Sequence, residues 1–284
     1  MRWAHVARKD FADASRAKML WVLTALMIVA VVGISAIPKL LYIPGEGGPA
    51  PDFEVAISYL FTTMTVMVSI IGLVVGYQAI VKERETGSIR FLLGLPFTRL
   101  DVLLGKAVGR AAVVAVPTVV GFAIGGAVIF VLYDGFVLTT YLGLLAFSIL
   151  MGLVYVTLAV GVSASVSTRA KAVTGVLGIY VLFDLLWWAV PMAIYWLLER
   201  ELPGTHDLPT WYVFVERLGV WNPLEVISGT MVDIAGVETI STADRIAGEV
   251  PFYLETWFAW VFIAAWIVVP LAIGYYRFKR AVIS

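Results

Sequence analysis

Six apolar stretches, each long enough to cross a lipid bilayer, constrain this chain more than any other feature of its sequence. They cover residues 19–37, 57–81, 111–132, 137–162, 172–198 and 257–276. A helix rises about 1.5 Å per residue, so about 20 apolar residues cross a hydrocarbon core of roughly 30 Å. The stretches are continuously apolar rather than alternating, which favours helices over a barrel. The sequence therefore predicts an all-α membrane protein with six transmembrane helices.

The composition supports this fold class. Of the 284 residues, 61% are hydrophobic and 14% are charged, and the mean hydropathy is +0.94. One soluble core could not bury that much apolar surface. The first stretch is followed by Pro38 and Lys39 rather than by a small-residue cleavage site, so we expect it to remain as a membrane helix. We expect residues 1–284 to form a single transmembrane domain.

The positive charges predict the orientation of the chain. Most of the 20 Lys and Arg residues fall in four segments, which are 1–18, 82–110, 169–171 and 277–280. Alternate crossings place these segments on one side, and basic residues are retained on the cytoplasmic side of a membrane. The opposite side carries most of the acidic residues. We therefore expect a multi-pass protein of the plasma membrane with both termini in the cytoplasm.

Two segments outside the spans are predicted to be helical. Residues 1–18 place apolar side chains at helical spacing between basic ones, which predicts a helix lying in the membrane interface. Residues 199–256 form the longest predicted loop, and we expect this extracytoplasmic segment to contain two short helices, beginning near Trp211 and Trp221. The connection from Tyr133 to Phe136 predicts a tight turn between the third and fourth spans.

Residues 82–106 are a charged segment between two apolar stretches. Residues 82–85 can continue the second span, and Gly87 permits the backbone to turn. Ser88 can cap a short helix over residues 89–93, which Pro96 would end, and Thr98 with Asp101 forms a capping box for the third span. The pattern predicts a short helix across the membrane surface, with Arg90 and the two glutamates free to pair with another protein.

This segment resembles that of a known family. A Glu-Arg-Glu-x-Gly-Ser turn, an apolar helix, a Pro, an Arg and a Gly-Lys entering the third span are similar to the permeases of ABC exporters of the second type. Within that family the chain resembles the branch that includes the permease of the nitrous-oxide-reductase maturation (copper-processing) transporter. The resemblance implies a coupling helix and hinges that fit a groove on an ATPase subunit, formed by Glu83, Arg84, Glu85, Gly87, Arg90, Pro96, Arg99, Gly105 and Lys106.

The resemblance also implies partners. It implies a separate ABC ATPase subunit, a second permease copy in a homodimer or a paralogue, and a minor contact at residues 163–171. The sequence has no phosphate-loop motif, since Gly105-Lys106 is preceded by leucines and followed by Ala107. We therefore expect no ATP hydrolysis by this chain, with ATP and Mg held on the partner. We expect no cofactor, no metal and no nucleic-acid partner, because cysteine is absent and His5 and His206 lie on opposite sides.

Polar residues within the spans are the other candidates. Asp184 is the only acidic residue in a predicted span, and such a charge is costly enough to suggest a gating or proton-linked role. The alternative is a packing role, with the carboxyl group bonded to a neighbouring Ser, Thr or Tyr. In the second span, Thr62, Thr65 and Ser69 could line a transport path or help helices to pack. The small-residue spacing of Gly72 and Gly76 in the same span favours helix packing.

Two other classes of function remain open from the residues. One is a secondary transporter or channel, for which only Asp184 and Pro117 come near the expected features. The other is an intramembrane enzyme, which lacks support because no His-Glu-x-x-His, no Gly-x-Ser-x-Gly and no second carboxylate in the spans occurs. The transported substrate does not follow from these residues.

Overall fold

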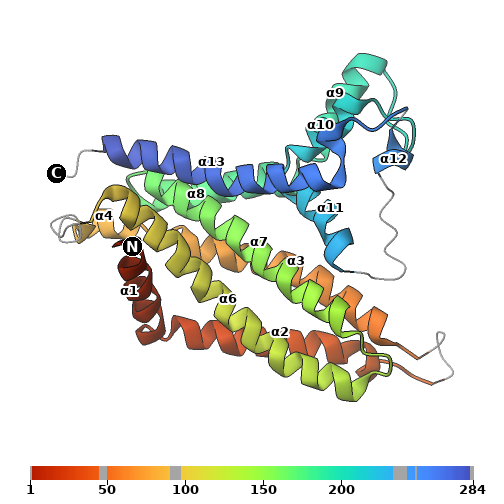
Figure 1. Cartoon of the computed structure of the whole chain (residues 1–284), viewed down its shortest axis with the longest axis horizontal. Helices are drawn as coiled ribbons and strands as arrows, with labels where there is room; N and C mark the ends of the chain where they lie inside the picture. Colours follow the sequence, from red (N-terminus) through yellow and green to blue (C-terminus); the bar gives the residue numbers. More distant parts are fainter. Residues whose placement is uncertain (1, 45–49, 90–96, 233–241, 247, 282–284) are drawn as a thin grey trace.

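The computed structural model describes residues 2–44, 50–89, 97–232, 242–246 and 248–281, and most of these residues are helical. The long helices run along the long axis of the molecule (Figure 1). Helices α1 and α4 and the C-terminal end of α13 lie at one end, and α9, α10 and α12 lie at the other (Figure 1). The chain thus has two distinct ends joined by a helical bundle.

Within the described residues, five helices are long and apolar enough to cross a membrane, and a bent pair would make a sixth. The fold class predicted from the sequence is therefore confirmed. The five are α2 (Met19–Leu40), α3 (Phe53–Gly76) continued by α4 (Val81–Glu85), α6 (Arg99–Leu132), α7 (Leu138–Ser165) and α13 (Ala259–Arg280) with the turn before it.

The expected fifth span, residues 172–198, is a broken helix rather than a continuous one. It consists of α8 (Arg169–Tyr180), the π-helical turn η1 (Val181–Leu185) and α9 (Ala189–Glu199), with a bend of 55° before α9. Pro191 has no N–H to donate to the carbonyl of Trp187, and that carbonyl instead accepts from Val190 at 3.0 Å. Proline is tolerated in the first turn of a helix, so α9 begins two residues before it.

Helix α7 lies at the centre of the bundle and contacts α3, α6 and α13. Glycines permit these close contacts. A side chain at Gly76 of α3 would lie 2.7 Å from Cβ of Ala159, and one at Gly274 of α13 would lie 2.7 Å from the carbonyl oxygen of Gly161. Small residues are typical of helix contacts within membranes because they let two backbones approach. The turn predicted between the third and fourth spans joins α6 to α7 at residues 133–137.

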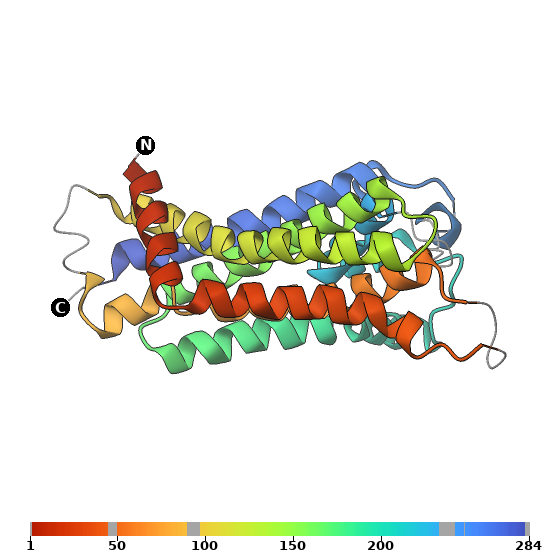
Figure 2. The same cartoon turned by 90° about the horizontal axis from the view of Figure 1, so that it is seen from below.

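The N-terminal helix α1 (Arg2–Arg16) stands across the end of the bundle (Figure 2). Its buried residues are Val6, Ala7, Asp10 and Ala14, which share one face, and it packs against α6. The apolar face predicted for residues 1–18 therefore covers the end of α6.

The segment between α4 and α6 is described only at its two ends. Gly87 has a φ of +71°, a left-handed conformation that favours glycine, as predicted. Thr98 and Asp101 form the predicted capping box at the start of α6, with the Thr98 backbone N–H donating to Asp101 Oδ2 at 3.0 Å. The predicted surface helix over residues 89–93, with Arg90, and the residue Pro96 that should end it, lie almost entirely outside the described residues.

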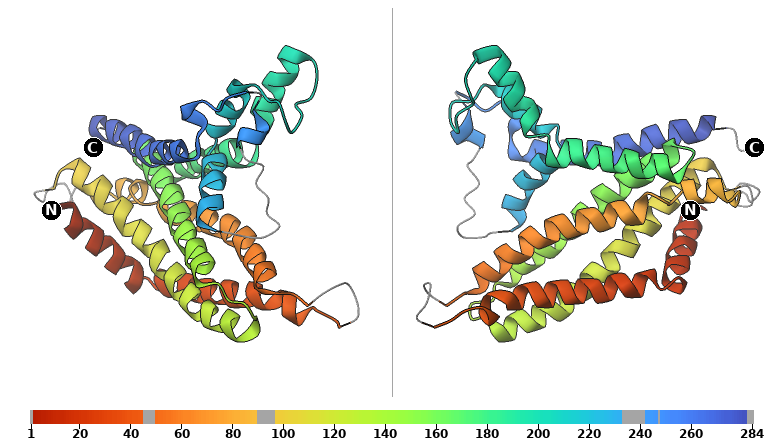
Figure 3. Two further views of the ribbon diagram at one scale, coloured as in Figure 1. Left: turned by 45° about the vertical axis from the view of Figure 1, so that its right-hand side comes forward. Right: turned by 180° about the vertical axis from the view of Figure 1, so that it is seen from behind.

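The end of the bundle opposite α1 carries short helices from the 199–256 segment. Two of these helices begin close to the starts predicted near Trp211 and Trp221, and a third short helix follows along the chain (Figure 3). The helices are α10 (Thr210–Arg217), α11 (Trp221–Met231) and α12 (Thr242–Arg245), followed by the 3-10 turns η2 (Phe252–Leu254) and η3 (Thr256–Phe258).

Candidate functional site

A buried cluster of four charged side chains lies where α1 crosses the bundle. Lys106 of α6 donates from Nζ to Asp10 Oδ1 of α1 at 2.8 Å, and its second partner is Glu83 Oε1 of α4. Arg110, one turn further along α6, forms an ion pair with Asp10, with Nε 2.9 Å from Oδ2. Lys106 is 6% exposed and Asp10 is 4% exposed. The cluster therefore joins three helices through charges that are largely shielded from water.

The close approach of α1 to α6 explains how these charges meet. A side chain at Gly105 would lie 2.7 Å from the carbonyl oxygen of Trp3, and one at Gly109 would lie 3.0 Å from the carbonyl oxygen of Ala7. Because glycine has no side chain, α1 lies directly against α6 at both positions. Asp10 is on the same face of α1, so its carboxylate is placed over Lys106 and Arg110.

Two contacts join α4 to the loop before α8. The Glu85 carboxylate accepts from the Arg169 backbone N–H at 2.7 Å and pairs with its guanidinium at 2.8 Å. Arg84 donates to the carbonyl oxygen of Val166 at 2.6 Å. The two loops predicted to be the major and minor contacts for an ATPase are thus bonded to each other. Glu83 and Glu85 were expected to be free, but both form ion pairs within the chain, and the Glu85 side chain stays 31% accessible.

The turn between α3 and α4 is fixed to α7 in the same region. The hydroxyl oxygen of Ser163 accepts from the backbone N–H groups of Ile80 and Val81, at 3.1 and 3.0 Å. All three residues are buried. The start of α4 would otherwise leave these donors without partners inside the bundle. Ser163 therefore couples the position of α4 to that of α7.

Arg99 joins the start of α6 to the end of α13. Its guanidinium donates to the carbonyl oxygens of Phe278, of Lys279 at 3.0 Å and of Ala281 at 3.1 Å. The last carbonyls of a helix have no partners within it, and a cation there also complements the helix dipole. Of the predicted coupling residues, Glu83, Arg84, Glu85, Arg99 and Lys106 thus all bond within the chain.

Asp10 and Arg110 are the members of the cluster that were not singled out from the sequence. The sequence does contain a pattern that could have identified Asp10. This residue lies four positions after Val6, three after Ala7 and four before Ala14. That spacing puts a carboxylate on the apolar face of an otherwise basic amphipathic helix. A charge in that position needs a buried partner, and Lys106 and Arg110 supply it.

Asp184 lies in the π-helical turn η1 and is hydrogen-bonded. Tyr155 of α7 donates to Asp184 Oδ1 at 2.8 Å, and Tyr180 also bonds to Asp184 and to Ser69 of α3. Ser69 is buried, whereas Thr62 is exposed and donates to the backbone of its own helix at 3.0 Å, as Thr65 does at 2.8 Å. The contacts of Asp184 are those of the packing alternative, and they link α3, α7 and the fifth span.

We expect the free energy of unfolding of Asp184→Asn to lie within about 1 kcal/mol of that of the unchanged protein. An amide oxygen can accept a hydrogen bond from the Tyr155 hydroxyl as the carboxylate does. Asp184→Leu should instead lose about 1–3 kcal/mol, since it leaves that hydroxyl without a partner. Thermal unfolding in detergent measures the difference, with Tyr155→Phe as the matched control. A transport defect in Asp184→Asn at unchanged stability would contradict a packing role.

Within the described part of the chain, no group of three or more His, Asp or Glu side chains is placed to hold a metal ion. The polar atoms gathered at the α1 end are instead paired as cations with carboxylates. Such a cluster can carry a displacement from one helix to another, because its members are held by several short contacts at once.

Comparisons with known proteins give one consistent result. A model of the family described as "ABC-2 family transporter protein" matches residues 4–282. The chain is 28% identical over 287 residues to the "Probable ABC transporter permease protein NosY" of Stutzerimonas stutzeri, covering 97% of each protein. It is 26% identical over 281 residues to the protein of the same name from Pseudomonas aeruginosa, again covering 97% of each.

Proposed function

Because this chain belongs to the ABC-2 family of transporter proteins and is the permease subunit of an ABC transporter, we propose that two copies of it form an exporter with two separate ATPase subunits. ATP and Mg bind to the ATPase subunits, and the permease supplies the path across the membrane. A paralogous permease in place of the second copy is the alternative assembly. Family membership also favours this function over a secondary transporter, a channel or an intramembrane enzyme.

The charge cluster is the observation that best supports coupling at this end of the bundle. Lys106 bonds to Asp10 of α1 and to Glu83 of α4, while Glu85 bonds to Arg169 at the start of α8. A force applied to the segment between α4 and α6 therefore reaches α1, α6 and the fifth span through direct ionic contacts. Residues 82–106, with Gly87 as a hinge and Gly105 at the contact with α1, are proposed as the coupling segment.

In the proposed transport cycle, the helices alternate between two packings. ATP binds more tightly to the closed pair of ATPases than to the open pair, and this difference supplies the bias between the two packings. Closure moves the coupling segment, and the ionic contacts carry that movement to α1 and α8. Spans that share few contacts with the centre can then shift as rigid bodies. Return to the first packing follows hydrolysis and release of the nucleotide.

The orientation is part of the proposal. The end that carries α1, α4 and the end of α13 holds most of the basic residues, and basic segments are retained in the cytoplasm. Both termini and the coupling segment then face the cytoplasm, where the ATPase is found, and α10 to α12 face outward. Because the sequence has no cysteine, a single cysteine can be introduced at Ser88 or at His206, and its labelling from each side of a sealed membrane can be compared. Labelling of the Ser88 position from outside the cell would contradict this orientation.

We expect Glu85→Lys to weaken ATPase binding about tenfold, as is typical for reversing one charged contact at an interface. Folding should change by less than about 1 kcal/mol, because the Glu85–Arg169 pair is partly exposed, with side chains 31% and 41% accessible. Co-purification of the ATPase and its permease-dependent hydrolysis measure the effect. Glu201→Lys is the matched control, since Glu201 is an exposed glutamate at the opposite end.

The exchanged pair Glu85→Arg with Arg169→Glu separates two explanations of that result. The exchange restores the ion pair within the permease but reverses the charges presented to a partner. Continued weak ATPase binding would support a direct contact by Glu85. Full recovery of binding and hydrolysis would contradict it and would limit Glu85 to a role inside the permease.

A further inference from the structure

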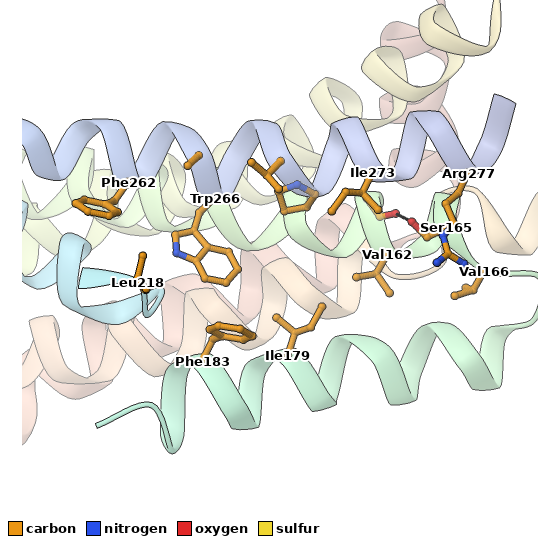
Figure 4. A pocket seen from close by; sticks show the side chains of 14 residues that line it. Val162, Ser165, Val166, Ile179, Phe183, Leu218, Phe262, Trp266, Ile273 and Arg277 are labelled. Carbon is orange, nitrogen blue, oxygen red and sulfur yellow. Dashed lines mark hydrogen bonds between the residues drawn. The ribbon is translucent and has the colours of Figure 1, made fainter. Parts of the chain in front are cut away.

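A cavity of about 600 Å³ lies between α7, α13 and the α8–η1 part of the fifth span (Figure 4). That volume is within the range of about 300–1,000 Å³ that small-molecule sites occupy. Its walls are almost entirely apolar, with Ile179 and Phe183 on one side and Trp266 and Ile273 on the other (Figure 4). The cavity is therefore suited to a hydrocarbon chain.

The cavity exists because α13 packs on α7 and not on α8. The backbones of α7 and α13 meet at Gly161 and Gly274, whereas α8 and α13 share almost no contacts. Towards α10, Phe183 and Trp266 meet across the gap, with their rings 5.1 Å apart, edge to face. Trp266 is held there by a hydrogen bond of 3.2 Å from its indole N–H to the carbonyl of Gly219. These two rings therefore join the opposite walls of the cavity at its aromatic end.

The other end of the cavity is basic. The side chain of Arg277 lines it next to Ser165 and Val166 (Figure 4). Within the described residues, Arg277 has no hydrogen bond or ion pair, whereas its neighbour Arg280 lies over the ring of Tyr276 at 4.1 Å. A guanidinium without a partner at the mouth of an apolar cavity provides donors for an anion that is joined to an apolar chain.

We propose that this cavity binds an anionic phospholipid of the leaflet at the α1 end, with its phosphate at Arg277 and one acyl chain against Trp266. The dimensions agree with this occupant. Trp266 and Arg277 are eleven residues apart on one helix, which is about 16 Å. Half of a hydrocarbon core of roughly 30 Å is about 15 Å, so a chain anchored at Arg277 ends near Trp266.

A helix of a second copy fits less well. An apolar helix, like a wholly apolar cargo, would cover the walls but leave the Arg277 guanidinium unpaired. The phospholipid matches both the charge at one end and the apolar walls, and it would take the place of the missing contact between α13 and the fifth span.

The test uses the full-length permease with its ATPase in lipid nanodiscs that contain a photoreactive phosphatidylglycerol with the reactive group on its acyl chain. Illumination should place adducts on residues 162–183 and 266–277. Ala265→Trp, which fills the cavity, should remove most of the label at these residues. Arg277→Ala should reduce it about fivefold. Ala264→Trp and Arg280→Ala are the matched controls, because both residues are exposed on α13 and neither lines the cavity.

Two results would overturn the proposal. Equal labelling of the Ala265→Trp and Ala264→Trp variants would show that the label comes from the general lipid surface. Equal labelling by a phosphatidylcholine analogue would exclude recognition of an anionic headgroup. Because Arg277→Ala leaves the walls intact, it tests the site even where Ala265→Trp does not fold.

Discussion

Lys106→Ala should lower the free energy of unfolding by about 3–5 kcal/mol, because it leaves the buried carboxylate of Asp10 and the partly buried carboxylate of Glu83 without their shared cation. Arg110 remains beside Asp10 but does not pair with Glu83, so one carboxylate loses its cation outright. The change also removes the link between α1 and α4. We therefore expect permease-dependent ATP hydrolysis to be lost together with stability.

Lys82→Ala is the matched control for this variant. Lys82 precedes Glu83 on the same short helix but is exposed, so its removal should change stability by less than about 0.5 kcal/mol. Thermal unfolding and nucleotide hydrolysis are measured on the purified complex. A second variant, Glu83→Gln with Lys106→Gln, removes one pair of charges and leaves Asp10 paired with Arg110, so it should be less damaging than Lys106→Ala. Equal stability of Lys106→Ala and Lys82→Ala would contradict a buried ionic cluster.

Gly161→Val should separate α13 from α7 and destabilise the permease by about 1–3 kcal/mol or more. A Cβ at this position would overlap the carbonyl group of Pro270, and backbone atoms of a packed helix cannot move aside as a flexible side chain can. Gly274 lies against Gly161 from the other helix, so the two backbones are in contact there. Displacing α13 also pulls on Arg99, which holds its last carbonyls.

Gly178→Val is the control for the cost of placing valine in a membrane helix. Gly178 is in α8, and a side chain there would meet nothing within 4 Å. Both variants carry the same β-branched residue, so the difference between their unfolding temperatures measures the contact alone. Unfolding at the same temperature would show that α13 does not approach α7 as closely as described.

Local features of the chain were predicted well where neighbours in sequence decide the structure. The capping box of Thr98 and Asp101 and the left-handed Gly87 both follow from residues a few positions apart. The break in the fifth span was not predicted, although Pro191 was visible. A proline in an apolar stretch bends, breaks or simply begins a helix according to what packs around it, and η1 is fixed by contacts with Tyr155 of α7.

Several residues of the charge cluster and its neighbours were named from the sequence, but their bonding was not predicted. The resemblance implied that Glu83, Glu85 and Lys106 belong to a segment that contacts an ATPase, and the structure pairs all three inside the chain. Asp10 and Lys106 are 96 positions apart, so no local pattern joins them. The interfacial helix was predicted, but its packing against α6 was not. That packing places Asp10 beside Lys106 and Arg110.

The sequence by itself determined that this protein is a helical membrane protein, which stretches are apolar enough to cross a bilayer and where charged segments interrupt them. Hydrocarbon imposes that result on each stretch separately, because every backbone donor and acceptor must be satisfied within its own helix. Only the tertiary structure decided which charges meet and where a cavity remains between α13 and the fifth span. Those outcomes depend on how closely helices distant in sequence approach, and glycines such as Gly105 and Gly161 set those distances.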